Sequence, residues 1–183
     1  MVGKLTTELI VAGFGGQGVL LFGKFLALAG LKEGKEVAWI PSYGPEMRGG
    51  TCNCTVVISE TAIGSPIIHS PSTVVVMNKP SLDKFGPRVS PNGLLLINSS
   101  LIDTTSDRKD INIHTVPANE IAIELGNGKA ANMVALGAYV ALTKVVPFDT
   151  VLGVIEEQFE KKKEFQSLNI TAAKKGFELL NGS

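Results

Sequence analysis

A glycine-rich segment near the N-terminus has the residue types and spacing of a ligand-binding turn. Three glycines in segment 13–18 match the pattern G-x-G-x-x-G, directly after the apolar run Leu9–Ala12 and directly before an apolar helix. In that context the free backbone amides at the start of the helix can bind an anion such as a phosphate. The alternative is a tight strand-to-helix turn that only packs against a neighbour. The candidate cofactor-binding residues are Gly13, Gly15, Gly16, Gln17 and Gly18.

Binding of a nicotinamide dinucleotide is the most specific chemistry that this turn could serve. Enzymes of that kind add an acidic residue at the end of the second strand, where it binds the ribose. Here the second predicted strand, Glu36–Ile40, is followed by Pro41 and Ser42, and its one acid lies at the opposite end. The sequence therefore disfavours NAD, and a stand-alone nucleotide-binding oxidoreductase is kept as an alternative.

A second candidate segment, residues 41–50 (PSYGPEMRGG), follows that strand. Ligand and partner contacts gather at the carboxyl ends of parallel strands, so this segment should lie beside the glycine turn, together with Asn78 and Asn98. Its Arg, Glu and Tyr could clamp an acidic group or a neighbouring chain. The alternative for Glu46 and Arg48 is a surface ion pair that contributes little. The candidate contact residues are Ser42, Tyr43, Glu46, Arg48, Gly49 and Gly50.

The chain has few side chains that could bind a metal or act as a thiol, with two cysteines and two histidines. Cys52 and Cys54 stand two apart in a predicted strand and share one face, a poor geometry for a mutual disulfide. The two histidines, His69 and His114, are far apart in the sequence, whereas iron–sulfur clusters and zinc sites need about four ligands. We therefore expect two reduced core thiols, no metal site and no catalytic residue on this chain.

The overall charge narrows the class of partner. Lys plus Arg equals Asp plus Glu at 17 each, so the formal net charge is zero. A neutral surface argues against nucleic acid or an anionic membrane as the main partner, and proteins near zero net charge tend to associate. The first eight residues lack the apolar stretch of a signal peptide, and Val19–Leu31 is too short to span a bilayer. We expect a cytoplasmic protein.

The predicted helices and strands, which must position these segments, indicate one α/β domain over residues 1–183. Continuous apolar runs at Val74–Met77 and Leu94–Ile97 are typical of central strands buried on both faces, whereas residues 51–58 alternate. A turn at 59–61 that leads to Ala62 and Ile63 suggests an antiparallel hairpin. The other predicted elements are a strand at 111–116 and helices at 19–31, 81–85, 118–125, 132–144, 150–163 and 171–180. They predict a three-layer α/β/α sandwich with a mostly parallel, mixed sheet.

The helix predicted at 19–31 is apolar around nearly its whole circumference, with Lys24 as its one strongly polar residue. A helix of this kind is buried on more than one side. One side should cover the sheet, and the other needs a second layer or a partner chain; in a chain this short we favour a partner subunit. Gly23 and Gly30 lie roughly on one face and would allow close approach there.

Several segments, taken in order, carry a family resemblance. They are 13–18 (GFGGQG), 41–50, 63–68 (IGSPII), 78–85 (NKPSLDKF), 98–100 (NSS) and, later, 131–137 (ANMVALG). The ordered set resembles the gamma subunit of 2-oxoacid:ferredoxin oxidoreductases. The form of residues 42–50 is most similar to the 2-oxoglutarate branch of that family.

The resemblance implies an accessory subunit of a multi-subunit oxidoreductase, with a fold like domain III of pyruvate:ferredoxin oxidoreductase. Such an enzyme decarboxylates a 2-oxoacid on thiamine diphosphate and magnesium, passes electrons through iron–sulfur clusters to ferredoxin, and transfers the acyl group to coenzyme A. Other subunits hold these cofactors, so the implied partners are alpha, beta and delta chains. Residues 42–50 would then contact those chains or help to enclose coenzyme A. Subunits of indolepyruvate, pyruvate or 2-oxoisovalerate ferredoxin oxidoreductases are the alternatives within the family.

Overall fold

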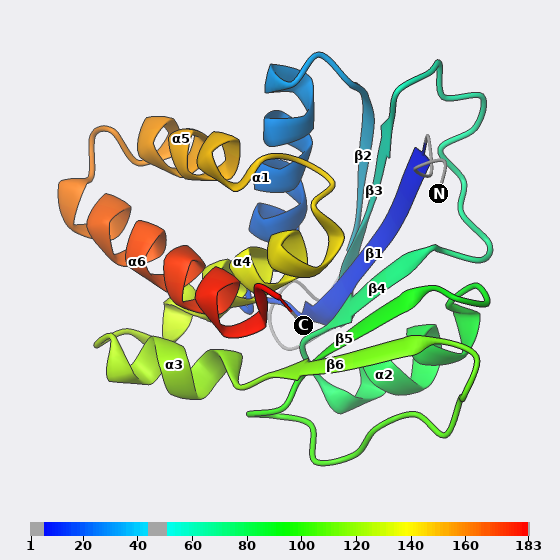
Figure 1. The fold of residues 1–183 in the computed structure, drawn as a ribbon. Helices are drawn as coiled ribbons and strands as arrows, with labels where there is room; N and C mark the ends of the chain where they lie inside the picture. The colour runs from blue at the N-terminus through cyan, green and yellow to red at the C-terminus, as the bar shows by residue number, and fades with distance from the viewer. Residues whose placement is uncertain (1–5, 44–50, 183) are drawn as a thin grey trace.

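The computed structural model describes residues 6–43 and 51–182, in which six strands form one sheet in the order β2-β3-β1-β4-β5-β6 (Figure 1). The strands are β1 Thr6–Phe14, β2 Glu36–Tyr43, β3 Thr51–Ser59, β4 Thr73–Val76, β5 Leu94–Asn98 and β6 Asn112–Val116. The helices are α1 Val19–Lys32, α2 Lys79–Phe85, α3 Ala118–Glu124, α4 Ala131–Thr143, α5 Phe148–Gln158 and α6 Lys163–Leu180, with short 3₁₀ turns η1 Gly86–Arg88 and η2 Gly128–Ala130.

The sheet is mixed because β3 runs against both of its neighbours. It pairs antiparallel with β2 on one side and with β1 on the other, while β1, β4, β5 and β6 pair in parallel. The hairpin expected between β3 and residues 62–63 is wrong, since that segment is not a strand and the hairpin partner is β2. The strands β2 and β3 are paired over eight residues each. By contrast, Ala62 and Ile63 are followed by Gly64 and Pro66, and a proline has no N–H group to donate to a strand ladder.

Two apolar cores lie on opposite faces of the sheet, which confirms the predicted α/β/α arrangement. The larger core packs α1, α4, α5 and α6 against one face, with α4 buried along almost its whole length. The smaller core lies under α2 and joins β1, β4 and β5. Figure 1 shows this asymmetry, with the long helices on one side of the sheet and the short α2 on the other.

Helix α1 is covered by its own chain to a greater extent than the sequence suggests. Its sheet-facing glycines, Gly23 and Gly30, lie against β3 and β2, where an added Cβ would stand 2.4 Å from the Cys54 sulfur and 2.9 Å from Val37 respectively. On another side, Phe25 makes an edge-to-face contact with Phe159 at the end of α5. Of the two possibilities for the second side, a layer of the same chain is the one found for most of the helix, not the favoured partner subunit, although Leu31 stays exposed.

Candidate functional site

The carboxyl ends of β1 and β2 lie in one row at the same edge of the sheet. Gly13 in β1 pairs with Cys52 in β3, and Cys52 pairs with Tyr43 at the end of β2. Two strand spacings, roughly 10 Å, therefore separate the glycine turn from the end of β2. The antiparallel β3 occupies the place where a dinucleotide fold has its second parallel strand, which further disfavours the binding of NAD.

The glycine turn needs glycine for two separate reasons. Gly16 has φ 96° and Gly18, the residue before α1, has φ 74°, a region that residues with a Cβ rarely adopt. Gly13 has no such conformation, but an added Cβ there would lie 2.6 Å from Gln17 and 2.9 Å from Met77. The space beside Gly16 is open, since nothing would lie within 4 Å of a Cβ added there. The turn therefore combines tight packing at its base with an open, exposed tip.

Gln17 holds the turn in place through its side-chain amide. Its Oε1 accepts from the backbone N–H of Phe14 at 2.6 Å, and its Nε2 donates to the carbonyl oxygen of Met77 at 3.1 Å. The amide of Asn78 also donates to the same Oε1, at 3.4 Å. Both ends of the Gln17 amide are thus used to tie the turn to the end of β4, so we assign it a positioning role.

Other carboxamides fix the surrounding elements. Asn132 of α4 donates to the carbonyl oxygen of Gly18 at 3.2 Å, which joins the starts of α1 and α4. Asn78 caps α2 through the N–H of Ser81, and Asn98 accepts from the N–H of Ala118 at the start of α3. The prediction that Asn78 and Asn98 end their strands at this edge is confirmed, and both side chains are buried and serve as caps.

A small hollow of about 130 Å³ opens beside the tip of the turn. Its lining comes from Gly16, Gln17, Met77, Asn119, Gly128, Lys129 and Ala131. The helix α4 begins here, and its start carries partial positive charge, although the N–H groups of Lys129, Ala130 and Ala131 are already bonded within the η2 turn. The exposed ammonium of Lys129 adds a full positive charge. The arrangement is suited to hold a small anionic group such as a phosphate or a carboxylate.

Sequence reasoning missed Asn119 and Lys129. The signal for Lys129 was present, because the segment Gly126–Asn127–Gly128 is typical of a turn directly before a helix. What joins it to the glycine turn is the tertiary packing of α4 on α1, which no local pattern reveals.

The second candidate segment is described only at its first three residues, 41–43. Ser42 is the penultimate residue of β2, opposite Asn53, and Tyr43 ends the strand opposite Cys52. Glu46, Arg48, Gly49 and Gly50 lie outside the described residues. Because Thr51 pairs with Phe14, and Tyr43 with Cys52, the described residues on both sides of 44–50 lie at the edge that carries the glycine turn.

Both cysteines are free and buried, which confirms their interpretation as core thiols. Burial raises the pKa of Cys52, and it raises the pKa of Cys54 to about 12 against weaker opposing hydrogen bonds from Trp39 and Gly23. Neither sulfur is therefore a thiolate near neutral pH, the form required for nucleophilic attack or metal ligation.

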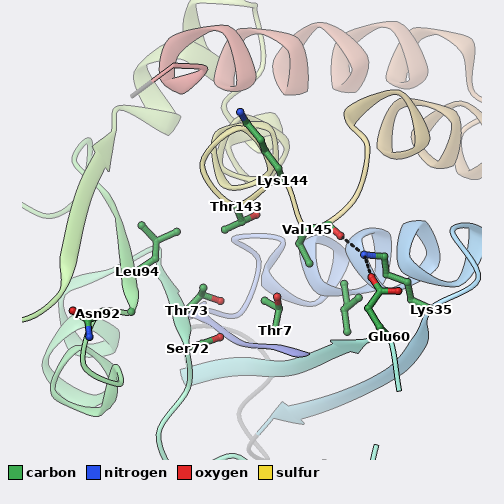
Figure 2. Close-up of a pocket in the computed structure, with 12 residues that line it drawn as sticks. Thr7, Lys35, Glu60, Ser72, Thr73, Asn92, Leu94, Thr143, Lys144 and Val145 are labelled. Carbon is green, nitrogen blue, oxygen red and sulfur yellow. Dashed lines mark hydrogen bonds and ion pairs between the residues drawn. The ribbon is translucent and has the colours of Figure 1, made fainter. Parts of the chain in front are cut away.

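A larger hollow, about 420 Å³, lies at the opposite edge, where β1 and β4 begin (Figure 2). One of its two lysines is already engaged, since the Lys35 ammonium contacts the Glu60 carboxylate at 2.8 Å and the Val145 carbonyl oxygen at 3.0 Å. Figure 2 shows Lys144 pointing away from this pair. The contacts tie the α1–β2 turn to the chain after α4, which is a structural duty.

Within the described residues, no group of three or more His, Cys, Asp or Glu side chains is placed to hold a metal ion. No helix in those same ranges is long and apolar enough to cross a membrane.

The sequence profile of the pyruvate ferredoxin/flavodoxin oxidoreductase family matches residues 8–179, nearly the whole chain and all of the elements above. The chain belongs to this family. Its relatives include a ketoisovalerate oxidoreductase subunit, VorA, from Methanothermobacter marburgensis, which is 43% identical over 155 residues. That match covers 85% of this chain but only 31% of the relative, so the chain spans about a third of that protein's length.

Other members of the family have the same extent as this chain. The 2-oxoglutarate synthase subunit KorC from Methanocaldococcus jannaschii is 33% identical over 179 residues, which is 96% of this chain and 95% of the relative. Among solved structures, the gamma subunit of a keto/oxoacid ferredoxin oxidoreductase from Geobacter sulfurreducens superposes with a TM-score of 0.83 at 29% identity, covering 97% of this chain and 99% of that one. Family and fold thus agree with the resemblance seen in the sequence.

Proposed function

We propose that this chain is the gamma-type accessory subunit of a 2-oxoacid:ferredoxin oxidoreductase. The observation that carries the proposal is the end-to-end match, in both sequence and fold, to separate subunits of such enzymes. The assembled enzyme would convert a 2-oxoacid and coenzyme A to an acyl-CoA and CO₂, with reduction of ferredoxin. It would operate in the cytoplasm with the thiamine diphosphate, magnesium and iron–sulfur clusters held by alpha, beta and delta chains.

The 2-oxoacid is proposed to be 2-oxoglutarate. Support comes from the KorC relatives, which match this chain over nearly its full length, and from the form of residues 42–50. A branched-chain 2-oxoacid is the second candidate, favoured by the higher identity to the ketoisovalerate subunit. Because the thiamine site would lie on other chains, an assay of the whole enzyme has to decide between them.

The local role proposed for this chain is to contact the anionic part of coenzyme A at the glycine turn. The hollow beside Gly16 combines the N-terminal end of α4 with Lys129, and phosphates favour such positive charge. Arg48, in the segment between β2 and β3, is proposed to complete the contact or to meet a neighbouring subunit. None of these residues is assigned a chemical step.

The proposal is tested on the intact complex, purified through a tag on this chain. Ferredoxin reduction should require coenzyme A and one of the two oxoacids. Lys129→Ala should raise the apparent KM for coenzyme A by roughly tenfold or more, since a charge-assisted hydrogen bond contributes about 1.5–3 kcal/mol and each 1.4 kcal/mol is tenfold, and should leave the KM for the oxoacid unchanged. Lys161→Ala, at the exposed α5–α6 turn, is the matched control. If both variants have the same KM for coenzyme A, Lys129 is not part of the site. If the complex is inactive with every 2-oxoacid, the proposed function is refuted.

A further inference from the structure

Among the described residues, three polar side chains line the hollow beside Gly16, namely Gln17, Asn119 and Lys129. The ammonium of a lysine has hydrogen-bond donors and no acceptor, whereas a carboxamide has both and can present either end. The end of each amide that faces the hollow therefore decides which chemical group the hollow can bind. The hydrogen bonds of the two amides fix that orientation.

The amide of Asn119 is oriented by the buried Asn98 at the end of β5. Asn98 is 1% exposed, and its Oδ1 accepts from the backbone N–H of Ala118 at 3.2 Å. Because a backbone N–H can only donate, the other end of this amide is its Nδ2, which donates to the Oδ1 of Asn119 at 2.8 Å. The oxygen of Asn119 is therefore used. Its Nδ2 is the end left for the hollow, and it has no hydrogen-bond partner within the described part of the chain.

The amide of Gln17 is fixed in a similar way, by two backbone groups. Its Oε1 accepts from the N–H of Phe14, and its Nε2 donates to the carbonyl oxygen of Met77. A half turn of the amide would set oxygen against oxygen and N–H against N–H, so both bonds would be lost. Since Nε2 carries two hydrogens and Met77 takes one, Gln17 has a donor left while its acceptor is occupied.

The backbone N–H groups at the start of α3 and in the η2 turn are bonded within the chain. The Oγ of Ser100 accepts from the N–H groups of Asn119 and Glu120, both at 3.1 Å. The N–H of Lys129 donates to the Oδ1 of Asn127 at 3.0 Å. A ligand in the hollow is therefore held mainly by side-chain donors. The volume of about 130 Å³ equals that of about four waters in the liquid, so the hollow admits one small group and not a whole nucleotide.

A phosphate group has the chemistry that matches these donors, because it is small, negatively charged and rich in acceptor oxygens. An amino or ammonium group would set donors against donors and leave them unpaired. We infer that Asn119 contacts a bound phosphate group beside Lys129, and that Asn98 is a positioning residue that keeps the Nδ2 of Asn119 toward the hollow. The inference deepens the proposed function and rests on it only for the identification of this phosphate as part of coenzyme A.

The first experiment measures phosphate binding to the isolated full chain by NMR of its side-chain amide groups. Inorganic phosphate, titrated against sodium chloride at equal ionic strength, should shift the Nδ2 signals of Asn119. It should leave those of Asn112 in place, because Asn112 begins β6 at the opposite edge of the sheet. Asn119→Ala should weaken phosphate binding by roughly tenfold or more, the effect of losing a hydrogen bond to a charged group.

Asn98→Asp tests the positioning role, measured at about pH 8, above the ordinary pKa of a carboxyl group. The carboxylate keeps an oxygen for the N–H of Ala118 but has no N–H to give to Asn119. The amide of Asn119 should then turn, donate to the carboxylate and face the hollow with its oxygen. Phosphate affinity should fall roughly tenfold or more, although Asn98 does not line the hollow. Ser100→Ala is the matched control, since it removes hydrogen bonds from the same helix start and keeps the amide pair, so it should lower the melting temperature and leave phosphate affinity nearly unchanged.

Asn119→Asp keeps the test decisive even if Asn98→Asp fails to fold. The half-buried side chain of Asn119 retains its bond from Asn98 in this variant and sets a second oxygen, with negative charge, at the hollow. The isolated variant should no longer bind phosphate. In the intact complex it should raise the KM for coenzyme A on the order of a hundredfold with kcat unchanged, because a lost hydrogen bond and a like-charge contact act together.

The inference is overturned if phosphate leaves the Asn119 signals in place, or if Asn119→Asp binds phosphate like the wild type. Wild-type affinity in a folded Asn98→Asp variant would overturn the positioning role. If the isolated Asn119→Asp chain loses phosphate while the complex keeps its KM for coenzyme A, the hollow takes free phosphate, and the contact with coenzyme A in the proposed function is wrong. The two failures are distinguishable, because the NMR titration needs no oxoacid turnover.

Discussion

Gly137 of α4 and Gly176 of α6 lie at the point where the two helices cross, each against the backbone of the other helix. A Cβ added to Gly137 would stand 1.9 Å from the carbonyl oxygen of Ala173, and a Cβ added to Gly176 would stand 1.9 Å from that of Val134. Neither carbonyl belongs to a flexible side chain, so only a separation of the helices could make room. The crossing joins the fully buried α4 to the outer helix α6.

Replacing either glycine at this crossing should destabilise the fold strongly. We expect Gly137→Ala and Gly176→Ala each to lower the free energy of unfolding by roughly 3 kcal/mol or more, because overpacking against backbone has no cheap relief. Urea unfolding followed by circular dichroism measures this. Gly153→Ala in α5 is the control, since nothing lies within 4 Å of its added Cβ and alanine favours a helix, so it should stabilise by about 0.5–1 kcal/mol. Similar midpoints for all three variants would contradict the close crossing.

Gly16 should be sensitive through its backbone alone. Gly16→Ala should cost about 1–2 kcal/mol, the usual penalty of a Cβ in the left-handed region, and Gly16→Val should cost more, since β-branching adds strain. Gly64→Val serves as the control, because Gly64 also has open space around its Cβ but no positive φ. If Gly16→Val and Gly64→Val have the same melting temperature, backbone strain is not the reason for a glycine at position 16.

The buried Cys54 thiol should make the protein less stable at alkaline pH. In the unfolded chain a thiol loses its proton near pH 8.5, whereas burial in the fold raises the pKa of Cys54 to about 12. Between these values the folded state binds more protons than the unfolded state, so the free energy of unfolding falls as pH rises, by up to about 1.4 kcal/mol per pH unit. Denaturant titrations from pH 8 to 10 should show a shallower decline for Cys54→Ala, and parallel curves for the two proteins would refute this linkage.

Arg48 lies outside the described residues, and its role stays a prediction from the sequence. Arg48→Ala should leave the melting temperature of the isolated chain nearly unchanged. It should weaken assembly with the catalytic chains, at a cost of roughly 2–5 kcal/mol if a desolvated partner is lost, or raise the KM for coenzyme A alone. Wild-type assembly together with wild-type kinetics for both substrates would reduce Arg48 to a surface ion pair with Glu46.

Most of the fold could be predicted because its elements are strongly patterned. The buried runs before Asn78 and Asn98 and the apolar helix after Gly18 appear as expected, within one or two residues at their ends. The connections were harder to predict. Helix α5 ends at Gln158, five residues before the predicted end at Lys163, and α6 begins at Lys163, eight residues before the predicted start at Thr171. Phe159, in the connection between them, packs on Phe25, a contact that no local pattern reveals.

The position of the candidate site could be predicted from the sequence, but the side-chain contacts that build it could not. The pattern of glycines identified the turn, and the strand order placed the end of β2 beside it. The sequence did not show that the amide of Gln17 would bond to both Phe14 and Met77, since such contacts depend on β4 lying next to β1. Lys129 was missed for the same reason, because it reaches the turn only through the packing of α4.

The side chains whose hydrogen bonds hold the glycine turn and its neighbours are neutral amides. The shape of this site should therefore depend little on pH or salt concentration. Gln17, Asn78, Asn98 and Asn132 neither gain nor lose protons in the physiological range, and bonds between uncharged groups are hardly screened by salt. The opposite edge instead relies on the Lys35–Glu60 ion pair, which is partly exposed and therefore open to screening. A rise in ionic strength should thus loosen the distal edge first, while the amide hydrogen bonds that shape the glycine turn should stay nearly unchanged.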